Sequence, residues 1–156
     1  MDLIEDRKYL RAIRPDLVAF DPDDKPVLIV EVKGVTPVPE SVSQLLSYMD
    51  SAVPAVPFGM LADPKDIRIY QSGSPIPVAI IPTADILRHY VTAEFSRPVS
   101  SALLTTTIEA WLSDLDSHWH SEIPPAVREM TPIGLLPRLK SGTIEREVSL
   151  VCHPIH

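Results

Sequence analysis

The stretch that decides the fold is Pro26-Val27-Leu28-Ile29-Val30-Glu31-Val32-Lys33. Its first half is apolar on both faces, which is the pattern of a strand covered on both sides of a sheet. Glu31 and Lys33 follow at the C-terminal end, and because side chains alternate along a strand they point to one face, with Val32 opposite. Charges in such a place are costly unless they are paired or coordinate a metal. The stretch therefore predicts both a covered strand and a candidate site at its end.

Short elements delimited by prolines surround this strand. Residues 16–21 predict a strand, and the turn signature Asp21-Pro22-Asp23-Asp24 permits antiparallel pairing with residues 26–33. Residues 39–51 predict a helix, since apolar side chains recur there at three- and four-residue intervals. Two more short strands are expected at residues 57–61 and 67–71, and residues 76–81 add another.

The second half of the chain changes character. Residues 83–94 and about 100–120 have helical spacing, and Trp111, Leu115 and Trp119 form an apolar stripe typical of a core or an interface. We therefore expect an α/β fold, with a strand-rich core over residues 1–82. Residues 83–156 are expected to form a mostly helical C-terminal extension packed on that core.

The composition excludes several classes of protein. The chain of 156 residues has 14 Lys and Arg against 21 Asp and Glu, a net charge of −7, which argues against a sequence-independent DNA coat. No apolar run approaches the ~18 residues that span a bilayer, and the acidic start lacks the pattern of a signal peptide. The single cysteine, Cys152, excludes an internal disulfide framework and fits a cytoplasmic location. The acidity remains compatible with an enzyme whose metal site needs carboxylates.

Five polar residues with possible catalytic roles are distributed over three predicted elements. Asp16 opens the first strand, and Glu31 and Lys33 close the second. Gln44 and Tyr48 lie one turn apart on the helix that follows. Two carboxylates and a lysine suit metal-assisted phosphodiester hydrolysis, because Mg²⁺ binds through one or two carboxylates and keeps several waters. The alternative is an ordinary ion pair at a solvated sheet end beside a half-exposed helix face.

The sequence resembles a known family over about residues 5–71. The run from Arg14-Pro15-Asp16-Leu17-Val18 through Ile29-Val30-Glu31-Val32-Lys33-Gly34 to Gln44-Leu45-Leu46-Ser47-Tyr48 is similar to the PD-(D/E)XK nuclease superfamily. It looks most like the nuclease domains of type I restriction subunits, which carry the additional Q-x-x-x-Y motif. The resemblance implies a restriction-endonuclease-like mixed central sheet flanked by helices. It also implies cleavage of DNA or RNA that depends on Mg²⁺ or Mn²⁺.

The resemblance assigns the metal to Asp16 and Glu31, together with the backbone carbonyl of Val32. The family usually has a further glutamate in a longer leading helix, and Glu5 is the one glutamate available before Pro15. The front of the chain is therefore shorter than the family pattern, which leaves open completion of the site by a partner subunit.

The same resemblance makes Lys33 the catalytic lysine and gives Gln44 and Tyr48 a role in supporting the site and contacting DNA. A second reading is a catalytically idle member of this fold that serves as a binding or assembly module. The scarcity of basic residues predicts weak, salt-sensitive binding of nucleic acid, or its delivery by a partner. No membrane partner is expected, and a homo-oligomer or a partner subunit remains open.

Overall fold

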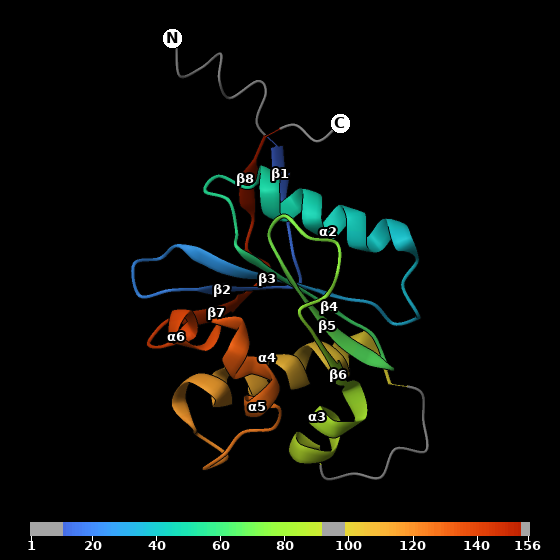
Figure 1. Ribbon diagram of the computed structural model, residues 1–156, viewed down its shortest axis with the longest axis vertical. Helices are drawn as coiled ribbons and strands as arrows, with labels where there is room; N and C mark the ends of the chain where they lie inside the picture. The colour runs from blue at the N-terminus through green and yellow to red at the C-terminus, as the bar shows by residue number, and fades with distance from the viewer. Residues whose placement is uncertain (1–10, 92–98, 154–156) are drawn as a thin grey trace.

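The computed structural model describes residues 11–91 and 99–153. Its centre is a six-stranded mixed sheet of β2 (Leu17–Phe20), β3 (Pro26–Val32), β4 (Phe58–Ala62), β5 (Asp66–Gln71), β6 (Ala79–Pro82) and β7 (Thr143–Arg146). The strand order is β6-β5-β4-β3-β2-β7 (Figure 1). A separate two-stranded sheet pairs β1 (Arg11–Ile13) with β8 (Leu150–Cys152). The mixed α/β class predicted from the sequence is therefore confirmed.

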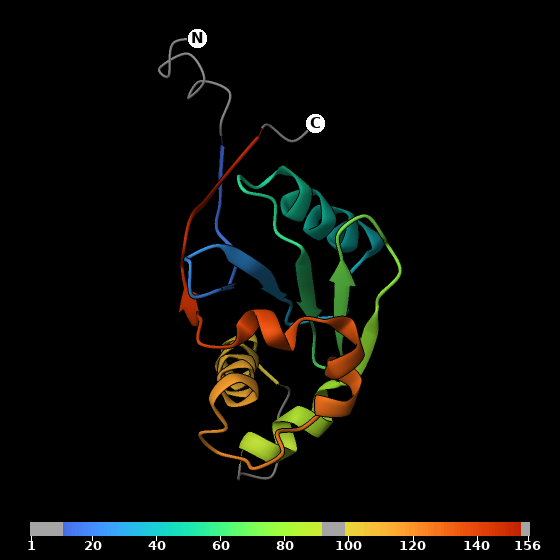
Figure 2. The ribbon, with the colours of Figure 1, turned by 60° about the vertical axis from the view of Figure 1, so that its left-hand side comes forward.

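Helices flank both faces of the large sheet (Figure 2). One face carries α2 (Pro39–Ser51), and the other carries α3 (Thr83–Tyr90) and α4 (Ser101–Ser117). The short helices α5 (Val127–Met130), η1 (Thr131–Ile133) and α6 (Leu136–Leu139) complete the second layer. Within the described ranges, no helix combines the length and apolar character that crossing a membrane requires.

The strand β3 lies inside the sheet and is paired on both edges. It runs antiparallel to β2 and parallel to β4, with α2 in the crossover between β3 and β4. The β2–β3 turn is held by the Asp21 carboxylate, which accepts the backbone N–H groups of Asp23 and Lys25 at 2.9 and 3.0 Å. This arrangement confirms the antiparallel hairpin that the Asp-Pro-Asp-Asp turn predicts.

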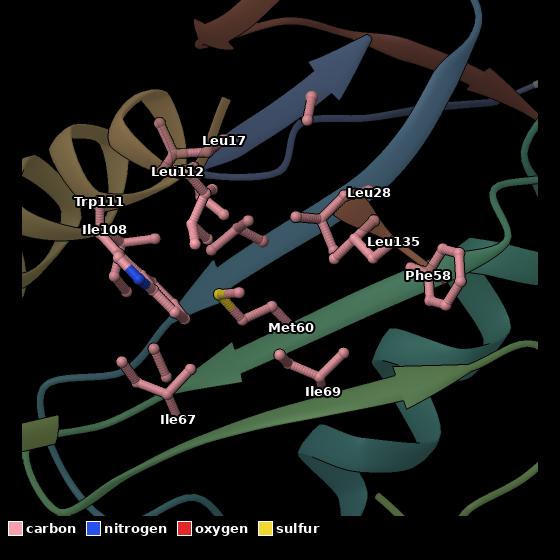
Figure 3. Close-up of a cluster of buried hydrophobic side chains, with 14 of the residues drawn as sticks. Leu17, Leu28, Phe58, Met60, Ile67, Ile69, Ile108, Trp111, Leu112 and Leu135 are labelled. Atoms are coloured by element: carbon pink, nitrogen blue, oxygen red, sulfur yellow. The ribbon is translucent and has the colours of Figure 1, made fainter. Parts of the chain in front are cut away.

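The larger hydrophobic core lies between the sheet and α4 (Figure 3). Trp111 is completely buried there, and its indole N–H donates to the Pro125 carbonyl at 2.8 Å, so the polar end of the ring is satisfied. Leu115 is also buried, whereas Trp119 is 55% exposed. Of the stripe predicted as core or interface, Trp111 and Leu115 lie in the core, whereas Trp119 lies beyond the helix, because α4 ends at Ser117 and the chain turns at His118 with a φ of 55°.

The helices α3 and α4 are joined by a partly buried polar contact. The Tyr90 hydroxyl donates to the Asp114 carboxylate at 2.6 Å, and the other oxygen of Asp114 accepts the backbone N–H groups of His120 and Ser121 at 3.0 Å each. Asp114 is completely buried, so these bonds compensate the loss of its hydration. They fix the turn after α4 against the end of α3.

The C-terminal part contributes a strand to the large sheet as well as helices. β7 pairs antiparallel with β2, with Arg146 opposite Leu17 and Thr143 opposite Phe20. The Arg146 guanidinium donates to both carboxylate oxygens of Glu109 at 3.0 Å, which ties β7 to α4. The edge of the sheet next to β2 is thereby closed by residues more than a hundred positions later in the chain.

Gly142 tests the contact between β7 and β2. A Cβ at Gly142 would lie 1.8 Å from the Phe20 carbonyl oxygen, whereas a Cβ at Gly34 would meet no atom within 4 Å. We expect Gly142→Ala to lower the free energy of unfolding by about 1–3 kcal/mol, because β7 must move away from β2. Gly34→Ala is the matched control, with an expected change within about 0.5 kcal/mol in urea denaturation. Equal effects of the two substitutions would contradict the close approach.

Candidate active site

Asp16 lies directly before β2 and faces the end of β3. Leu17 pairs with Val30, which brings Asp16, one residue earlier, next to Glu31. The Asp16 backbone N–H donates to the Val30 carbonyl at 3.1 Å, and its carboxylate oxygen Oδ2 accepts the Val32 N–H at 2.7 Å. The residue as a whole is exposed. Its carboxylate is therefore fixed on one side by β3 and open to a ligand on the other.

Glu31 points to the sheet face that α2 covers. Ile29, two residues earlier on β3, and Leu61, its partner on β4, both belong to the buried cluster beneath α2. Glu31 itself is half-buried at the edge of this cluster. Burial raises the pKa of Glu31 to about 7, the negative charge of Asp16 adds to the rise, and the positive charge of Lys33 opposes it.

Lys33 continues the line of β3 beyond its last residue. Its backbone N–H donates to the Ala62 carbonyl at 2.8 Å, which extends the parallel pairing with β4. Two residues apart on an extended strand, Lys33 and Glu31 share one face, and the side chain of Lys33 is half-buried. The structure thus brings together the three charged groups Asp16, Glu31 and Lys33 that the sequence places at this sheet end.

Gln44 and Tyr48 come from α2, above the same face. The Gln44 amide Nε2 donates to the Tyr48 hydroxyl oxygen at 2.7 Å, and the Tyr48 ring packs against the cluster that contains Leu45 and Met49. In the described parts of the chain, no hydrogen bond joins this pair to Asp16, Glu31 or Lys33. The structure therefore brings Gln44 and Tyr48 together on the helix that covers the sheet face of Glu31.

The backbone carbonyl of Val32 and the Glu5 carboxylate are the two other predicted metal ligands. Val32 donates its N–H toward Asp16, and the N–H and C=O of one strand residue point to the same neighbouring strand. The Val32 carbonyl thus lies on the Asp16 side of β3. Glu5 falls outside the described residues, so its predicted role as a metal ligand has no structural placement.

The donor set fits a hard divalent cation. Carboxylate and carbonyl oxygens are the ligands that Mg²⁺ and Mn²⁺ prefer. Among residues 11–91 and 99–153, no group of three or more His, Cys, Asp and Glu side chains is arranged to hold a metal. Asp16 and Glu31 could provide two of the ligands and water the others, because Mg²⁺ in proteins usually retains several water ligands.

A cleft of about 290 Å³ borders the other side of Asp16. It is lined by Arg14, Pro15, Asp16, Thr105, Arg146 and Glu147. The sequence predicts no role for Arg14, which precedes the P-D motif, and none for Thr105, Arg146 or Glu147. Their proximity to Asp16 depends on the pairing of β7 with β2, for which the sequence carries no local signal.

Comparison with known proteins gives no relative for this chain. No protein-family model matches it, and no curated protein or solved structure matches it either.

Because the pKa of Glu31 is raised, we expect the free energy of unfolding, measured in EDTA, to be lower at about pH 8 than at about pH 5. The folded state keeps a proton on Glu31 that the unfolded chain releases above its ordinary pKa of 4.5. Stability from this group therefore falls as the pH rises through this window to about 7. We expect the wild type to lose about 1–3 kcal/mol more than Glu31→Gln in urea denaturation.

Glu145→Gln, on an exposed position of β7, removes a carboxylate of the same kind and is expected to follow the wild type. Identical pH dependence of the wild type and Glu31→Gln would contradict the burial and charge environment of Glu31.

Proposed function

We propose that this chain is a divalent-metal-dependent nuclease of the restriction-endonuclease-like fold that hydrolyses phosphodiester bonds of DNA. The observation that carries the proposal is the hydrogen bond from the Val32 N–H to the Asp16 carboxylate, which holds Asp16 beside Glu31. The order of the charged residues and their positions on an antiparallel strand pair support it, as does the mixed six-stranded sheet flanked by helices.

Asp16 and Glu31 would hold Mg²⁺ or Mn²⁺, with the Val32 carbonyl as a further ligand. When bound, the ion would polarise the phosphoryl group and lower the pKa of a bound water. Both carboxylates must be ionised to act as ligands. Because the pKa of Glu31 is about 7, both are ionised in the metal-free protein only above this pH. The chain's own contribution is the strand pairing that presents two oxygen donors at one point.

Lys33 supplies the positive charge of the site. Its ammonium only donates hydrogen bonds. It can therefore orient the attacking water by donating to a lone pair of the water oxygen, or stabilise charge on the phosphate oxygens. The half-buried position beside Glu31 strengthens such an interaction relative to bulk water. Lys33 is therefore the residue whose removal tests the chemistry most cleanly.

The Gln44–Tyr48 pair would contact the nucleic-acid backbone. The Tyr48 hydroxyl oxygen accepts a hydrogen bond from the Gln44 amide, so the Tyr48 O–H remains available to donate to a phosphate oxygen. The net charge of −7 leaves few cations for long-range attraction, and we expect weak, salt-sensitive binding of DNA unless a partner subunit or a second copy delivers it.

A second candidate function is a catalytically idle binding or assembly module with the same fold. The observation that favours it is the net charge of −7, which disfavours tight binding of nucleic acid by this chain alone. Metal binding distinguishes the two functions, because a module that does not cleave has no need of a cation between Asp16 and Glu31.

Lys33→Ala tests the nuclease directly. We expect Asp16→Asn, Glu31→Gln and Lys33→Ala each to reduce Mg²⁺-dependent cleavage of plasmid or single-stranded DNA by at least about 100-fold. Lys25→Ala is the matched control, because Lys25 is an exposed lysine in the turn at the opposite end of β3 and its loss should change the rate by less than about twofold. Cleavage that survives Lys33→Ala in protein free of contaminating nucleases would refute the assignment.

Calorimetric titration with Mn²⁺ separates the nuclease from the idle module. We expect binding of one equivalent by the wild type at about pH 8, where Glu31 is ionised, and at least about tenfold weaker binding by Asp16→Asn. Native mass measurement is made on the same samples. Absence of Mn²⁺ binding together with a stable complex would favour the module.

A further inference from the structure

The cleft beside Asp16 is built from three separate parts of the chain. Arg14, Pro15 and Asp16 form the connection from β1 to β2, Thr105 belongs to α4, and Arg146 and Glu147 stand at the end of β7. Because β2 lies between β3 and β7, Asp16 has Val32 on one side and this cleft on the other. The proposed metal ligand thus forms a wall shared by the candidate site and the cleft.

One of the two arginines in the cleft is already compensated. Arg146 donates to Glu109 through Nε and a terminal nitrogen, both at 3.0 Å, and to the Thr106 hydroxyl at 3.1 Å. Its side chain is therefore fixed along α4, and its charge is balanced by a carboxylate. Arg146 shapes the wall of the cleft more than it attracts a ligand.

Arg14 differs from Arg146 in this respect. It is exposed, and within residues 11–91 and 99–153 it has no carboxylate at ion-pair distance. The following residue, Pro15, is buried and favours an extended backbone at Arg14, so the position of Arg14 two residues from Asp16 is held by the backbone. A guanidinium that has no carboxylate partner can bind a phosphate group through its planar set of N–H donors.

We propose that this cleft binds the phosphodiester backbone of the substrate strand next to the scissile bond, with Arg14 as the phosphate-binding residue. The inference rests on the proposed nuclease function and extends it to the path of the strand. Asp16 and Glu147 oppose an anion in the cleft until a cation compensates Asp16, so binding there should depend on the divalent metal. A guanidinium could also bind an acidic peptide, and comparison of DNA with a polyglutamate peptide distinguishes the two ligands.

The test measures DNA binding by fluorescence anisotropy in Mg²⁺ at several salt concentrations. All proteins carry Lys33→Ala to prevent cleavage, and Arg14→Gln is compared with Arg11→Gln. Arg11 is the matched control, because it is an exposed arginine on β1 three residues away that does not line the cleft. We expect Arg14→Gln to weaken binding about 5–10-fold at low salt and to reduce the salt slope by about 0.7–0.9, the loss of one phosphate contact.

Arg11→Gln should change the affinity by less than about twofold and leave the slope unchanged. Equal behaviour of the two variants, absence of measurable DNA binding, or tighter binding of a polyglutamate peptide than of DNA would overturn the inference. Loss of cleavage in Lys33→Ala, measured separately, decides the nuclease function itself. A change of slope at Arg14 without any cleavage by the wild type would support the cleft and refute the nuclease.

Discussion

The hydrogen bond between the Asp16 carboxylate and the Val32 N–H connects two strands at the point where their regular pairing ends. A bond to a charged acceptor of this kind is worth about 1.5–3 kcal/mol. Here its main effect is positional, because it fixes the carboxylate next to the last residues of β3. The candidate site, the charge environment of Glu31 and the boundary of the cleft all follow from that position.

The sheet beneath the site explains why the charges are not dispersed into water. β3 is paired on both edges, and its two faces are covered by α2 on one side and α4 on the other. Val30 and Val32 therefore point into the larger core, and Glu31 is left at the edge of the smaller one. A carboxylate in this place resists ionisation, and a neighbouring cation stabilises the ionised form. Burial of Glu31 therefore disfavours its ionised form as long as no cation lies beside it.

Much of the first half of the fold could be predicted because its signals are local. The apolar run of β3, the Asp21 turn and the periodicity of α2 each act within a few residues, and the structure confirms all three. The position of β7 could not be predicted, because its pairing with β2 depends on packing across more than a hundred residues. The position of Trp119 outside the helix could not be predicted for a similar reason, since the end of α4 is fixed by contacts of Asp114 with the following turn.

The residues of the candidate site also differ in whether local sequence signals predict their proximity. Asp16, Glu31 and Lys33 are close in sequence to strand ends that the hairpin brings together, whereas Arg146 and Glu147 reach the cleft only through the sheet edge. The most direct measurement of the central claim is a crystal structure grown with Mn²⁺, in which the anomalous signal locates the ion. We expect one ion at about 2.0–2.6 Å from a carboxylate oxygen of Asp16 and from one of Glu31. An ion bound elsewhere, or none in crystals with both carboxylates accessible at about pH 8, would contradict it.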